Sequence, residues 1–452
     1  MNNSAKIQLP EACRFIIDRL DKYGYQGYAV GGCVRDSLMR RQPNDWDITT
    51  NALPEQLLEI FSDLPVIKTG LKHGTVTVMI EHEPFEVTTF RIDGNYSDGR
   101  HPDRVSFTSS ITDDLARRDF TVNAMAYNEK TGLVDPFGGV QDLERKIIRC
   151  VGEPERRFRE DALRLLRAVR FSAALGFSIE KKTLSALKTC SPTITLVAKE
   201  RIFSELKKTV IAPYVSAALR TAPDPFFAAI PELAVIQNTP QNSRYHIYDV
   251  WEHTLHALEH ISPDVTSRLA VLFHDVGKGI CRMVGKDGYD HFYGHALHSA
   301  KLTYQALKTL RCDNKTLQDV VALVELHDTH FPMRQAKFRR LLSRLGYPLF
   351  FKLLDVSRAD SLSHAPWCIE ERCNALTEAK QEATRLQQEN YCLTLKQLAI
   401  TGRDLIELGL NGKEIGEVLN SLLDAVIIGQ IPNDRAILLK KAEHRINRKK
   451  NV

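Results

Sequence analysis

The chain has 452 residues, of which 43% are hydrophobic and 26% charged. This is the balance of a soluble globular protein of two to four domains. The net charge of +5 does not by itself identify a nucleic-acid binder, and the nine cysteines contain no CxxC pair that would indicate a thiolate zinc site. No apolar run approaches the length of a membrane-spanning helix, and the first residues do not resemble a secretory signal. We therefore expect a cytoplasmic protein with no membrane segment.

The predicted elements change character along the chain. Residues 11–23 have the apolar spacing of an amphipathic helix, which Gly24 ends. A strand at 28–30 leads into a Gly-Gly pair, and residues 76–80 and 85–90 alternate between apolar and polar side chains as half-buried strands do. The first part of the chain is therefore predicted to combine a sheet with helices.

A loop and a long helical region follow. Residues 91–104 are rich in Gly, Asp, Asn and Ser and predict a loop, whereas helical periodicity dominates from about residue 156 onward. The predicted fold is an α/β head with a small mixed sheet, followed by an elongated all-α neck, body and tail. The expected boundaries are 1–150 for the head, 151–235 for the neck, 236–385 for the body and 386–452 for the tail.

The most informative segment of the head is GGCVRDSLMRRQPNDWDITT at residues 31–50. A turn at Gly31 and Gly32 lets backbone amides approach a phosphate closely, and Arg35 adds a cation beside that turn. Asp45 and Asp47 are two residues apart, so an extended backbone projects both from one face. The repulsion between two such carboxylates is relieved by a hard divalent cation, and Mg²⁺ fits that need.

A third carboxylate, Glu86, lies in the strand PFEVTTFR and can complete the same site. Such a site would activate a ribose hydroxyl for in-line attack on an α-phosphate and would stabilise the leaving pyrophosphate. The sequence thus predicts Asp45, Asp47 and Glu86 as catalytic residues.

Several motifs together give a specific resemblance. Gly-Gly, Arg-Asp and Asp-x-Asp in this order resemble the nucleotidyltransferase superfamily that includes DNA polymerase β. Further motifs resemble the bacterial (class II) type of CCA-adding tRNA nucleotidyltransferase, and they are KTGLKHGTVTV, DLARRDFTVNAMAY, DPFGGVQDL, REDALRLLRAVRFSAALGF and ERIFSELKK. The resemblance implies CTP and ATP as substrates, tRNA as partner and Mg²⁺ as cofactor.

The resemblance also assigns roles to individual residues. It implies that Gly32 and Arg35 contact the triphosphate and that Asp45 and Asp47 hold the magnesium ion. It places the nucleotide and its ribose at Arg118 and Asp119. It assigns recognition of the base to Asp161 and Arg164, and contacts toward the phosphates to Arg167 and Arg170.

The spacing of the last four residues also supports a role in recognition independently of the resemblance. Asp161, Arg164, Arg167 and Arg170 are spaced by three, so one continuous helix would line them along one face. An acceptor beside a guanidinium matches the Watson–Crick edge of cytosine or adenine, whereas uracil and guanine present mismatched patterns. The alternative is a solvated stripe of ion pairs. The loop at 91–104 looks full length, which in this family favours addition of the terminal adenosine as well as the cytidines.

A second constellation occupies residues 245–365. The pair His274 and Asp275 in an apolar helix before Gly-Lys resembles the HD-type metal-dependent phosphohydrolases, and the resemblance adds His253 and Asp360 as ligands. Imidazoles with carboxylates suit a divalent transition metal. Phosphomonoesters or 2′,3′-cyclic phosphates at RNA ends are the substrates expected if this site is active. His295 and His327 are possible further ligands or phosphate contacts, and His256, His260 and His298 are read as bystanders.

Alternatives remain open at this point. They are a poly(A) polymerase of the same superfamily, an enzyme that adds only cytidines or only adenosine, a phosphohydrolase with a regulatory nucleotide-binding head, and a catalytically silent RNA-binding protein. The C-terminal segment 398–431 reads as short helices joined at Gly402, Gly409 and Gly412. By resemblance this tail contacts tRNA phosphates, and otherwise it is a helical cap.

Overall fold

A computed structural model describes residues 6–94 and 105–450. The chain divides between Ala234 and Val235 into two compact units, and the short segment Thr309–Arg311 groups with the first of them. No helix in these described ranges is long and apolar enough to cross a membrane. Residues 95–104 of the predicted loop lie outside the described part of the chain.

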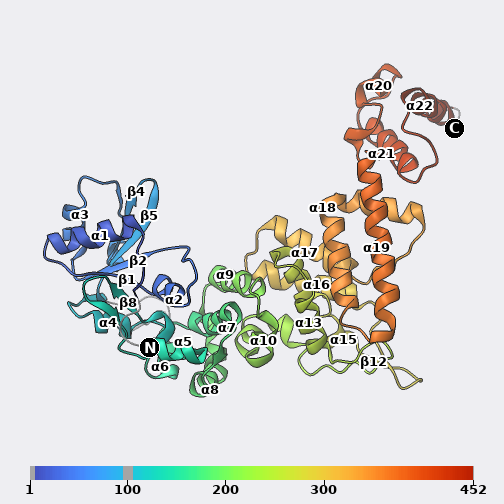
Figure 1. Ribbon diagram of the computed structural model, residues 1–452. Helices are drawn as coiled ribbons and strands as arrows, with labels where there is room; N and C mark the ends of the chain where they lie inside the picture. The colour runs from blue at the N-terminus through green and yellow to red at the C-terminus, as the bar shows by residue number, and fades with distance from the viewer. Residues whose placement is uncertain (1–5, 95–104, 451–452) are drawn as a thin grey trace. The chain divides into compact units, whose positions relative to one another are not determined.

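The first unit begins with a mixed sheet whose strands follow the order β3-β4-β5-β2-β1-β8-β9 (Figure 1). Its central pairs are antiparallel for β1 with β2 and with β8, and parallel for β2 with β5. This mixed sheet confirms the predicted α/β head. The strands are β1 Gly27–Val30, β2 Asp47–Thr50, β3 Val66–Ile67, β4 Thr75–Ile80, β5 Glu83–Thr89, β8 Ala126–Asn128 and β9 Gly132–Val134.

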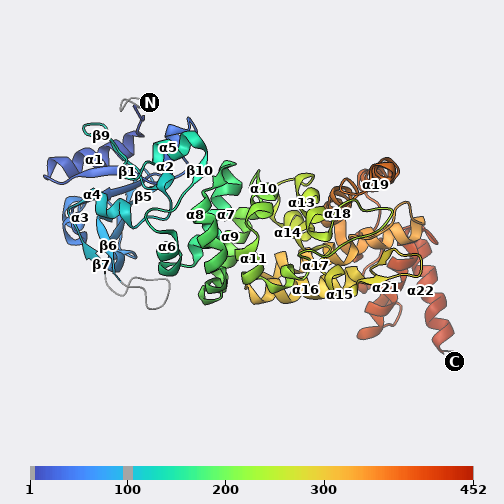
Figure 2. The ribbon, with the colours of Figure 1, turned by 90° about the horizontal axis from the view of Figure 1, so that it is seen from below.

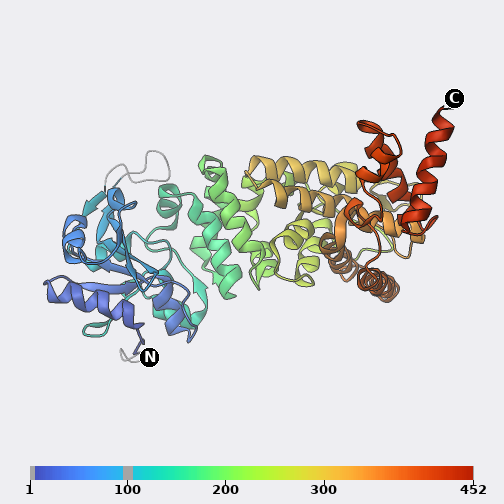
Figure 3. The ribbon, with the colours of Figure 1, turned by 90° about the horizontal axis from the view of Figure 1, so that it is seen from above.

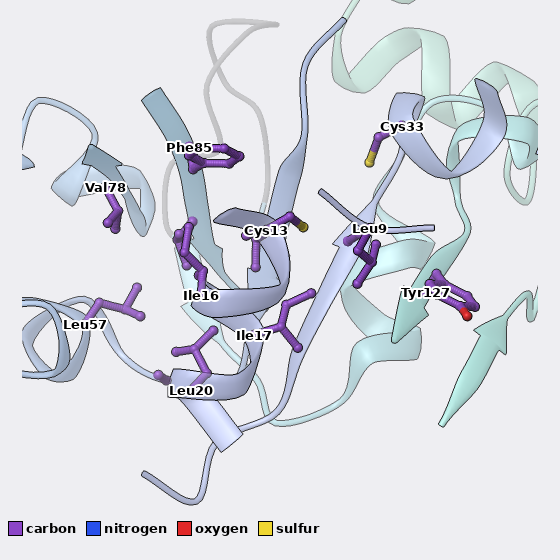
Figure 4. Close-up of a cluster of buried hydrophobic side chains, with 14 of the residues drawn as sticks. Leu9, Cys13, Ile16, Ile17, Leu20, Cys33, Leu57, Val78, Phe85 and Tyr127 are labelled. Atoms are coloured by element: carbon purple, nitrogen blue, oxygen red, sulfur yellow. The ribbon is translucent and has the colours of Figure 1, made fainter. Parts of the chain in front are cut away.

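Apolar side chains cover both faces of this sheet. Helix α1 (Glu11–Lys22) buries Cys13, Ile16, Ile17 and Leu20, which follow the i, i+3, i+4, i+7 spacing of one helix face. These residues pack with side chains from β4 and β5 in one core, which Figure 4 shows around Val78 and Phe85. The opposite face has a smaller cluster that is formed by Tyr28, Val30, Phe90, Leu115, Ala124, Ala126 and Val151. Apolar packing on both faces therefore fixes the positions of the sheet's strands and of the polar side chains that they carry.

The remaining elements of the first unit are mostly helices. Figures 2 and 3 show the green helices α7 to α10 packed beside one another, and α7 contacts both α9 and α10. The helices are α2 Gly32–Leu38, α3 Pro54–Ile60, α4 Ile111–Ala116, α5 Gly139–Arg145, α6 Pro154–Glu160, α7 Leu163–Leu175, α8 Lys181–Cys190, α9 Lys199–Val210, α10 Val215–Thr221, α11 Asp224–Ala229 and α12 Pro231–Ala234. Short strands and 3-10 turns complete the unit: β6 Arg91–Asp93, β7 Val105–Phe107, β10 Ile147–Ile148, β11 Ser178–Ile179, η1 Leu71–His73, η2 Thr121–Asn123 and η3 Ser191–Leu196.

The second unit is almost entirely helical, as predicted. Its longest helices, α18 and α19, run side by side in Figure 1 and bury a shared core that includes Phe338, Phe350 and Leu376. Its helices are α13 Val250–Glu259, α14 Val265–Phe273, α15 Lys278–Cys281, α16 His295–Thr309, α17 Asn314–Leu326, α18 Gln335–Ser361, α19 Pro366–Gln388, α20 Gly402–Glu407, α21 Lys413–Ile427 and α22 Arg435–Lys450. A two-stranded ribbon, β12 Met283–Val284 with β13 Asp290–His291, and the turn η4 Leu395–Gln397 complete it.

The C-terminal helices form a cluster with its own core. Leu405 of α20, Leu422 of α21 and Leu438 of α22 are all fully or almost fully buried there. The glycines that were expected to separate these helices do so, since Gly402 begins α20 and both Gly409 and Gly412 have positive φ between α20 and α21. The division into head, neck, body and tail remains a proposal, because the structure itself separates two units.

Candidate functional site

Three carboxylates gather around the start of strand β2 and the middle of its neighbour β5. In the parallel register Ile48 pairs with Val87, so Asp47 and Glu86 directly precede the paired residues and face away from the buried side. Trp46 packs partly buried against the core, and Asp45 is close enough for its charge to act on Asp47. Burial by the surrounding protein atoms raises the pKa of Asp47, because it disfavours the charged carboxylate. The positive charge of Arg118 lowers this pKa, whereas the negative charges of Glu86 and Asp45 raise it further. The grouping has the oxygen donors and the excess negative charge that a hard divalent cation neutralises.

The Gly-Gly turn lies beside these carboxylates. Gly31 adopts φ 82° and ψ −125° just before α2, and its amide donates to the Met125 carbonyl at 3.1 Å. A Cβ at Gly31 would lie 2.9 Å from Nη1 of Arg118. Glycine is therefore required both by the backbone conformation and by the closeness of this guanidinium. Arg35 is fixed nearby, since its Nη1 donates to Asn123 Oδ1 at 2.6 Å.

The turn opens onto a cavity of about 460 Å³. Its lining combines Asp47 with a series of arginines and two further acids. The lining residues are Gly31, Gly32, Arg35, Asp47, Arg117, Arg118, Asp119, Asn123, Asp161, Leu163, Arg164, Arg167, Arg170, Phe171 and Arg201. All the nucleotide-binding residues predicted from the sequence thus line one cavity, whereas Asp45 and Glu86 lie beside its Asp47 edge.

Buried acids hold several of these arginines in place. Arg167 Nε donates to Asp119 Oδ2 at 2.7 Å, and Arg170 Nε lies 2.9 Å from Glu205 Oε2. Burial acts to raise the pKa of Asp119, but the charge and hydrogen bond of Arg167 outweigh it and hold this pKa at about 2. The Arg170 guanidinium also lies over the Phe171 ring, 4.2 Å from its centroid. The cationic wall is therefore pre-organised rather than loosely solvated.

One feature of the predicted helix face is wrong. Asp161 is not part of the helix that carries Arg164, because it follows α6 in an extended conformation with φ −141° and ψ 104°. The helix α7 begins only at Leu163, where Asp161 Oδ1 accepts from the Leu163 amide at 3.0 Å. Local capping by a short acidic side chain interrupts the helix here, which spacing alone does not reveal.

The structure adds partners to this pair that sequence reasoning missed. Arg201 Nη2 donates to Asp161 Oδ2 at 3.0 Å from helix α9, 40 residues away along the chain. Arg164 is largely buried, and it donates to Glu160 Oε2 at 2.8 Å and to the Arg117 carbonyl at 2.9 Å. Arg201 belongs to the motif ERIFSELKK, but nothing in that motif indicates its partner. Asn123, in the motif DLARRDFTVNAMAY, was likewise missed as the residue that orients Arg35.

A second cluster lies inside the second unit. His253 of α13, His274 at the end of α14 and Asp360 of α18 meet around Asp275. His253 Nε2 lies 2.8 Å from Asp360 Oδ1 and 3.4 Å from His274 Nε2, and His274 Nε2 lies 3.2 Å from Asp275 Oδ2. The four ligands predicted from the sequence are thus brought together.

Backbone carbonyls fix the orientation of the imidazoles in this cluster. His274 Nδ1 donates to the Val271 carbonyl at 2.7 Å, and His253 Nδ1 donates to the Ser363 carbonyl at 3.2 Å. This leaves both Nε2 atoms pointing at the carboxylates, the arrangement that positions histidine ligands around a metal. Burial alone would lower the pKa of His274, but Asp275 and Asp360 raise it to about 10, so the cluster favours positive charge at its centre.

The histidines read as bystanders lie apart from this cluster. His256 stacks on Tyr248 with ring centroids 4.1 Å apart, and both His260 and His298 are exposed. His295 and His327 lie close to Asp275 instead, with His295 Nε2 at 3.4 Å from Asp275 Oδ1. Groups of side chains placed to hold a metal ion within the described residues include His253 with His274 and Asp275, and Asp275 with His295 and His327.

Comparisons with known proteins match this architecture over nearly the whole chain. Family models described as "Poly A polymerase head domain", "Probable RNA and SrmB- binding site of polymerase A" and "tRNA nucleotidyltransferase domain 2 putative" match residues 27–149, 176–223 and 295–442. The CCA-adding enzyme of Lactobacillus helveticus (strain DPC 4571) is 33% identical over 436 residues, which cover 95% of each chain. The chain belongs to the CCA-adding enzyme family.

Further relatives of this family agree. The CCA-adding enzyme of Geobacillus kaustophilus (strain HTA426) is 46% identical over 220 residues, so the matched part spans 48% of this chain and about half (54%) of that relative. A crystal structure of the Bacillus stearothermophilus CCA-adding enzyme in complex with CTP superposes with a TM-score of 0.72 at 30% identity. It covers 97% of this chain and 98% of that chain.

Replacing Gly31 by alanine tests the close approach of Arg118. We expect Gly31→Ala to lower the free energy of unfolding by about 2 to 3 kcal/mol, because an unfavourable backbone conformation and a displaced guanidinium add together. Gly412→Ala is the matched control, since Gly412 has a similar backbone conformation, with φ 54° and ψ −129°, but open space around its Cβ position, and it should cost only the backbone strain of about 1 to 2 kcal/mol. Urea unfolding of both variants measures the difference. Equal losses would contradict a contribution from Arg118.

Proposed function

We propose that this chain is a metal-dependent tRNA nucleotidyltransferase that adds or repairs the 3′-terminal CCA of tRNA from CTP and ATP, without a nucleic-acid template. One observation carries the proposal: Asp47, which lies beside Asp45 and Glu86, lines the same arginine-rich cavity as Asp161 and Arg164. Phosphate chemistry and base recognition can therefore occur on one bound nucleotide. The full-length similarity to a CCA-adding enzyme supports the same conclusion.

The residues around Asp47 fit a magnesium site. Asp45, Asp47 and Glu86 offer adjoining carboxylates, and the pKa of Asp47 is raised by burial first and then by the negative charges of the other two. Asp45 and Asp47 would hold the metal, with Glu86 completing the face that it occupies. When bound, Mg²⁺ supplies charge neutralisation at the reacting phosphate and favours loss of a proton from the attacking hydroxyl.

The chain's own groups bind and orient the nucleotide. Gly31 leaves backbone space for a phosphate, and Arg35 and Arg118 supply cations beside it, positioned by Asn123 and Asp114. Arg167 and Arg170 extend the same positive wall and are fixed by Asp119 and Glu205. Because these pairs are formed before a nucleotide binds, the wall loses little entropy on binding.

Base recognition rests on Asp161 and Arg164. A carboxylate can accept from the amino group of cytosine or adenine, and a guanidinium can donate to the adjacent ring nitrogen. Uracil and guanine have a ring N–H where this guanidinium needs an acceptor, so they leave donors facing each other. Arg201 Nη2 lies 3.0 Å from Asp161 Oδ2, and this ion pair supports a role for Arg201 in fixing the orientation of the Asp161 carboxylate.

The histidine cluster supports a second candidate function. We propose that His253, His274, Asp275 and Asp360 hold a divalent transition metal and that this site hydrolyses phosphomonoesters or 2′,3′-cyclic phosphates at RNA ends. The convergence of two Nε2 atoms, whose rings are oriented by carbonyls at Nδ1, with two carboxylates supports this donor set. This proposal is independent of nucleotidyl transfer, because its residues all belong to the second unit.

Reciprocal variants test the separation of the two activities. Asp45→Ala should abolish nucleotide incorporation and leave hydrolysis of p-nitrophenyl phosphate with Mn²⁺ or Ni²⁺ unchanged, because it removes only a head carboxylate. Asp275→Asn should have the opposite effect, since it removes a charged ligand while keeping the side-chain shape. Loss of both activities in either variant would contradict independent sites.

Arg164→Ala tests base recognition. We expect incorporation of CTP and ATP to fall by about 10- to 100-fold and discrimination against UTP to weaken, because a charge-assisted hydrogen bond of about 1.5 to 3 kcal/mol is lost. Arg156→Ala is the control, since Arg156 pairs with the same Glu160 but is 76% exposed and lies outside the cavity lining. Unchanged discrimination in Arg164→Ala would overturn the assignment.

Three tRNA transcripts distinguish the family activities. Transcripts ending before the CCA, after C and after CC should all grow to one common CCA end when CTP, ATP and Mg²⁺ are supplied, as sized on a gel. Extension of the first only to CC would indicate a cytidine-adding enzyme, and extension of only the CC form by A would indicate an adenosine-adding enzyme. Long adenosine tracts would indicate a poly(A) polymerase.

A further inference from the structure

Two large aromatic rings are exposed near the histidine cluster of the second unit. Trp367, in the first turn of α19, is 62% exposed, and Tyr245, in the segment before α13, is 46% exposed. Their ring centroids lie 5.2 Å apart, with the ring planes tilted by 40°. His246, which follows Tyr245, lies 5.3 Å ring to ring from His253. Large aromatic rings usually contribute to the core, so a pair left open to solvent indicates a binding surface.

Hydrogen bonds hold the two segments that carry these rings against each other. Trp367 Nε1 donates to the Arg244 carbonyl at 3.2 Å, and the Ala365 amide donates to the Tyr245 carbonyl at 2.8 Å. Pro366 begins α19 between these two contacts and restricts the backbone there. The rings are therefore ordered before a ligand arrives, so little side-chain freedom is lost when a flat group stacks on them.

Guanidinium groups accompany the rings. The Cζ atom of Arg372 lies 5.7 Å from the centroid of the Tyr245 ring. Arg244 is exposed, and its Cζ atom lies 5.3 Å from the centroid of the Tyr289 ring. Rings interleaved with guanidinium groups are typical of surfaces that bind single-stranded nucleic acid, because bases stack on the rings and phosphates meet the cations. A purely apolar partner would leave these cations without a counter-charge.

Arg372 connects the rings to the histidine cluster. It lines a cavity of about 50 Å³ together with Asp360 and His327, among other residues. Its Nη1 donates to His364 Nε2 at 3.3 Å, and His364 Nδ1 donates in turn to the Asp360 carbonyl at 2.9 Å. Arg372 follows Trp367 by five residues, which is about 8 Å along a helix. One nucleotide bridges that span, so a base on the rings can place its phosphate beside the cavity.

We propose that Tyr245 and Trp367 form a stacking site for the unpaired last base of an RNA chain, and that Arg372 directs the phosphate of that nucleotide towards the histidine cluster. Every base has an aromatic face, so stacking does not depend on which base is present. The site therefore accepts RNA ends by their shape rather than by their sequence. This proposal rests on the hydrolytic function proposed above and specifies how the substrate of that function is bound.

Substrates with and without a base test this site. The preference for a base is the kcat/KM for adenosine 3′-monophosphate divided by that for glycerol 2-phosphate, both measured with Mn²⁺. We expect Trp367→Ala to lower this preference by about 10- to 100-fold, because the stacked base loses its partner. Trp367→Phe keeps an aromatic face and should keep most of the preference. Tyr304→Ala is the matched control and should keep all of it, since Tyr304 is an exposed ring beside Lys308, nine residues beyond His295 on α16.

Fluorescence gives a second readout that needs neither turnover nor a substitution in the site. The chain has three tryptophans, so Trp367 is the only one left in the full-length Trp46→Phe/Trp251→Phe variant. A base stacked on Trp367 should quench its emission. Without added metal, we expect quenching by an adenosine trinucleotide that ends in a 3′-phosphate and no quenching by glycerol 2-phosphate. Adenosine 3′-monophosphate should bind more weakly than the trinucleotide, because it offers Arg244 no second phosphate.

The outcomes separate this proposal from the hydrolytic function. Quenching without hydrolysis of any of these substrates would overturn the hydrolytic function and leave the stacking site intact. Hydrolysis without quenching, with the preference for a base unchanged in Trp367→Ala, would overturn the stacking site and leave the hydrolytic function intact. Equal affinity for the mononucleotide and the trinucleotide would overturn the assignment to an RNA end in favour of a free nucleotide. Dimerisation that shields Trp367 from every nucleotide would show that the rings bind a second copy of the chain instead.

Discussion

The pairing of closely spaced arginines with buried acids is the constraint on which the first unit depends. Guanidinium groups that share a cavity repel one another, and they cannot escape by losing protons. Asp119 and Glu205 are almost fully buried beneath Arg167 and Arg170, and Asp114 lies fully buried next to Arg118. The acids thus allow a concentration of positive charge to exist in a folded protein, and Arg118, Arg167 and Arg170 still line the cavity.

The histidine centre of the second unit also gathers charged and polar groups in a buried place, but it uses imidazoles and carboxylates instead of guanidinium groups. Here histidines and aspartates converge from helix ends and a helix interior, and carbonyls at the ends of α14 and α17 orient two of the rings. The unpaired carbonyls of a helix's last turn would otherwise need a separate partner. The same contacts therefore satisfy two of these carbonyls and fix the orientation of both rings.

Much of this arrangement could be predicted from the sequence, because it depends on local patterns. The spacing of Cys13, Ile16 and Leu20 defines the buried face of α1, and the second aspartate of the Asp-x-Asp pair, Asp47, begins β2, while Asp45 precedes the strand. The exceptions depend on geometry or on long-range contacts. Spacing by three suggested one helix face through Asp161, but a capping interaction begins α7 two residues later.

Contacts between distant segments could not be predicted from the sequence for another reason. Arg201 reaches Asp161 from another helix, and no local pattern reports which acid a given arginine will meet. The position of Asp275 among four histidines is of the same kind, since it depends on how five helices meet and not on any single motif. Residue types indicated that His295 and His327 could be ligands, but only the fold shows that they lie close to Asp275.

The break between α6 and α7 has a consequence for how this protein can evolve. Asp161 lies in the extended link, whereas Leu165, Leu166 and Val169 of α7 are completely buried in the core. The acceptor that faces the cavity is thus encoded separately from the side chains that hold the helix in place. Under the role proposed for Asp161, substitutions in this link change the acceptor offered to a base without repacking the interior, so substrate preference is more readily altered by mutation than the fold that supports it.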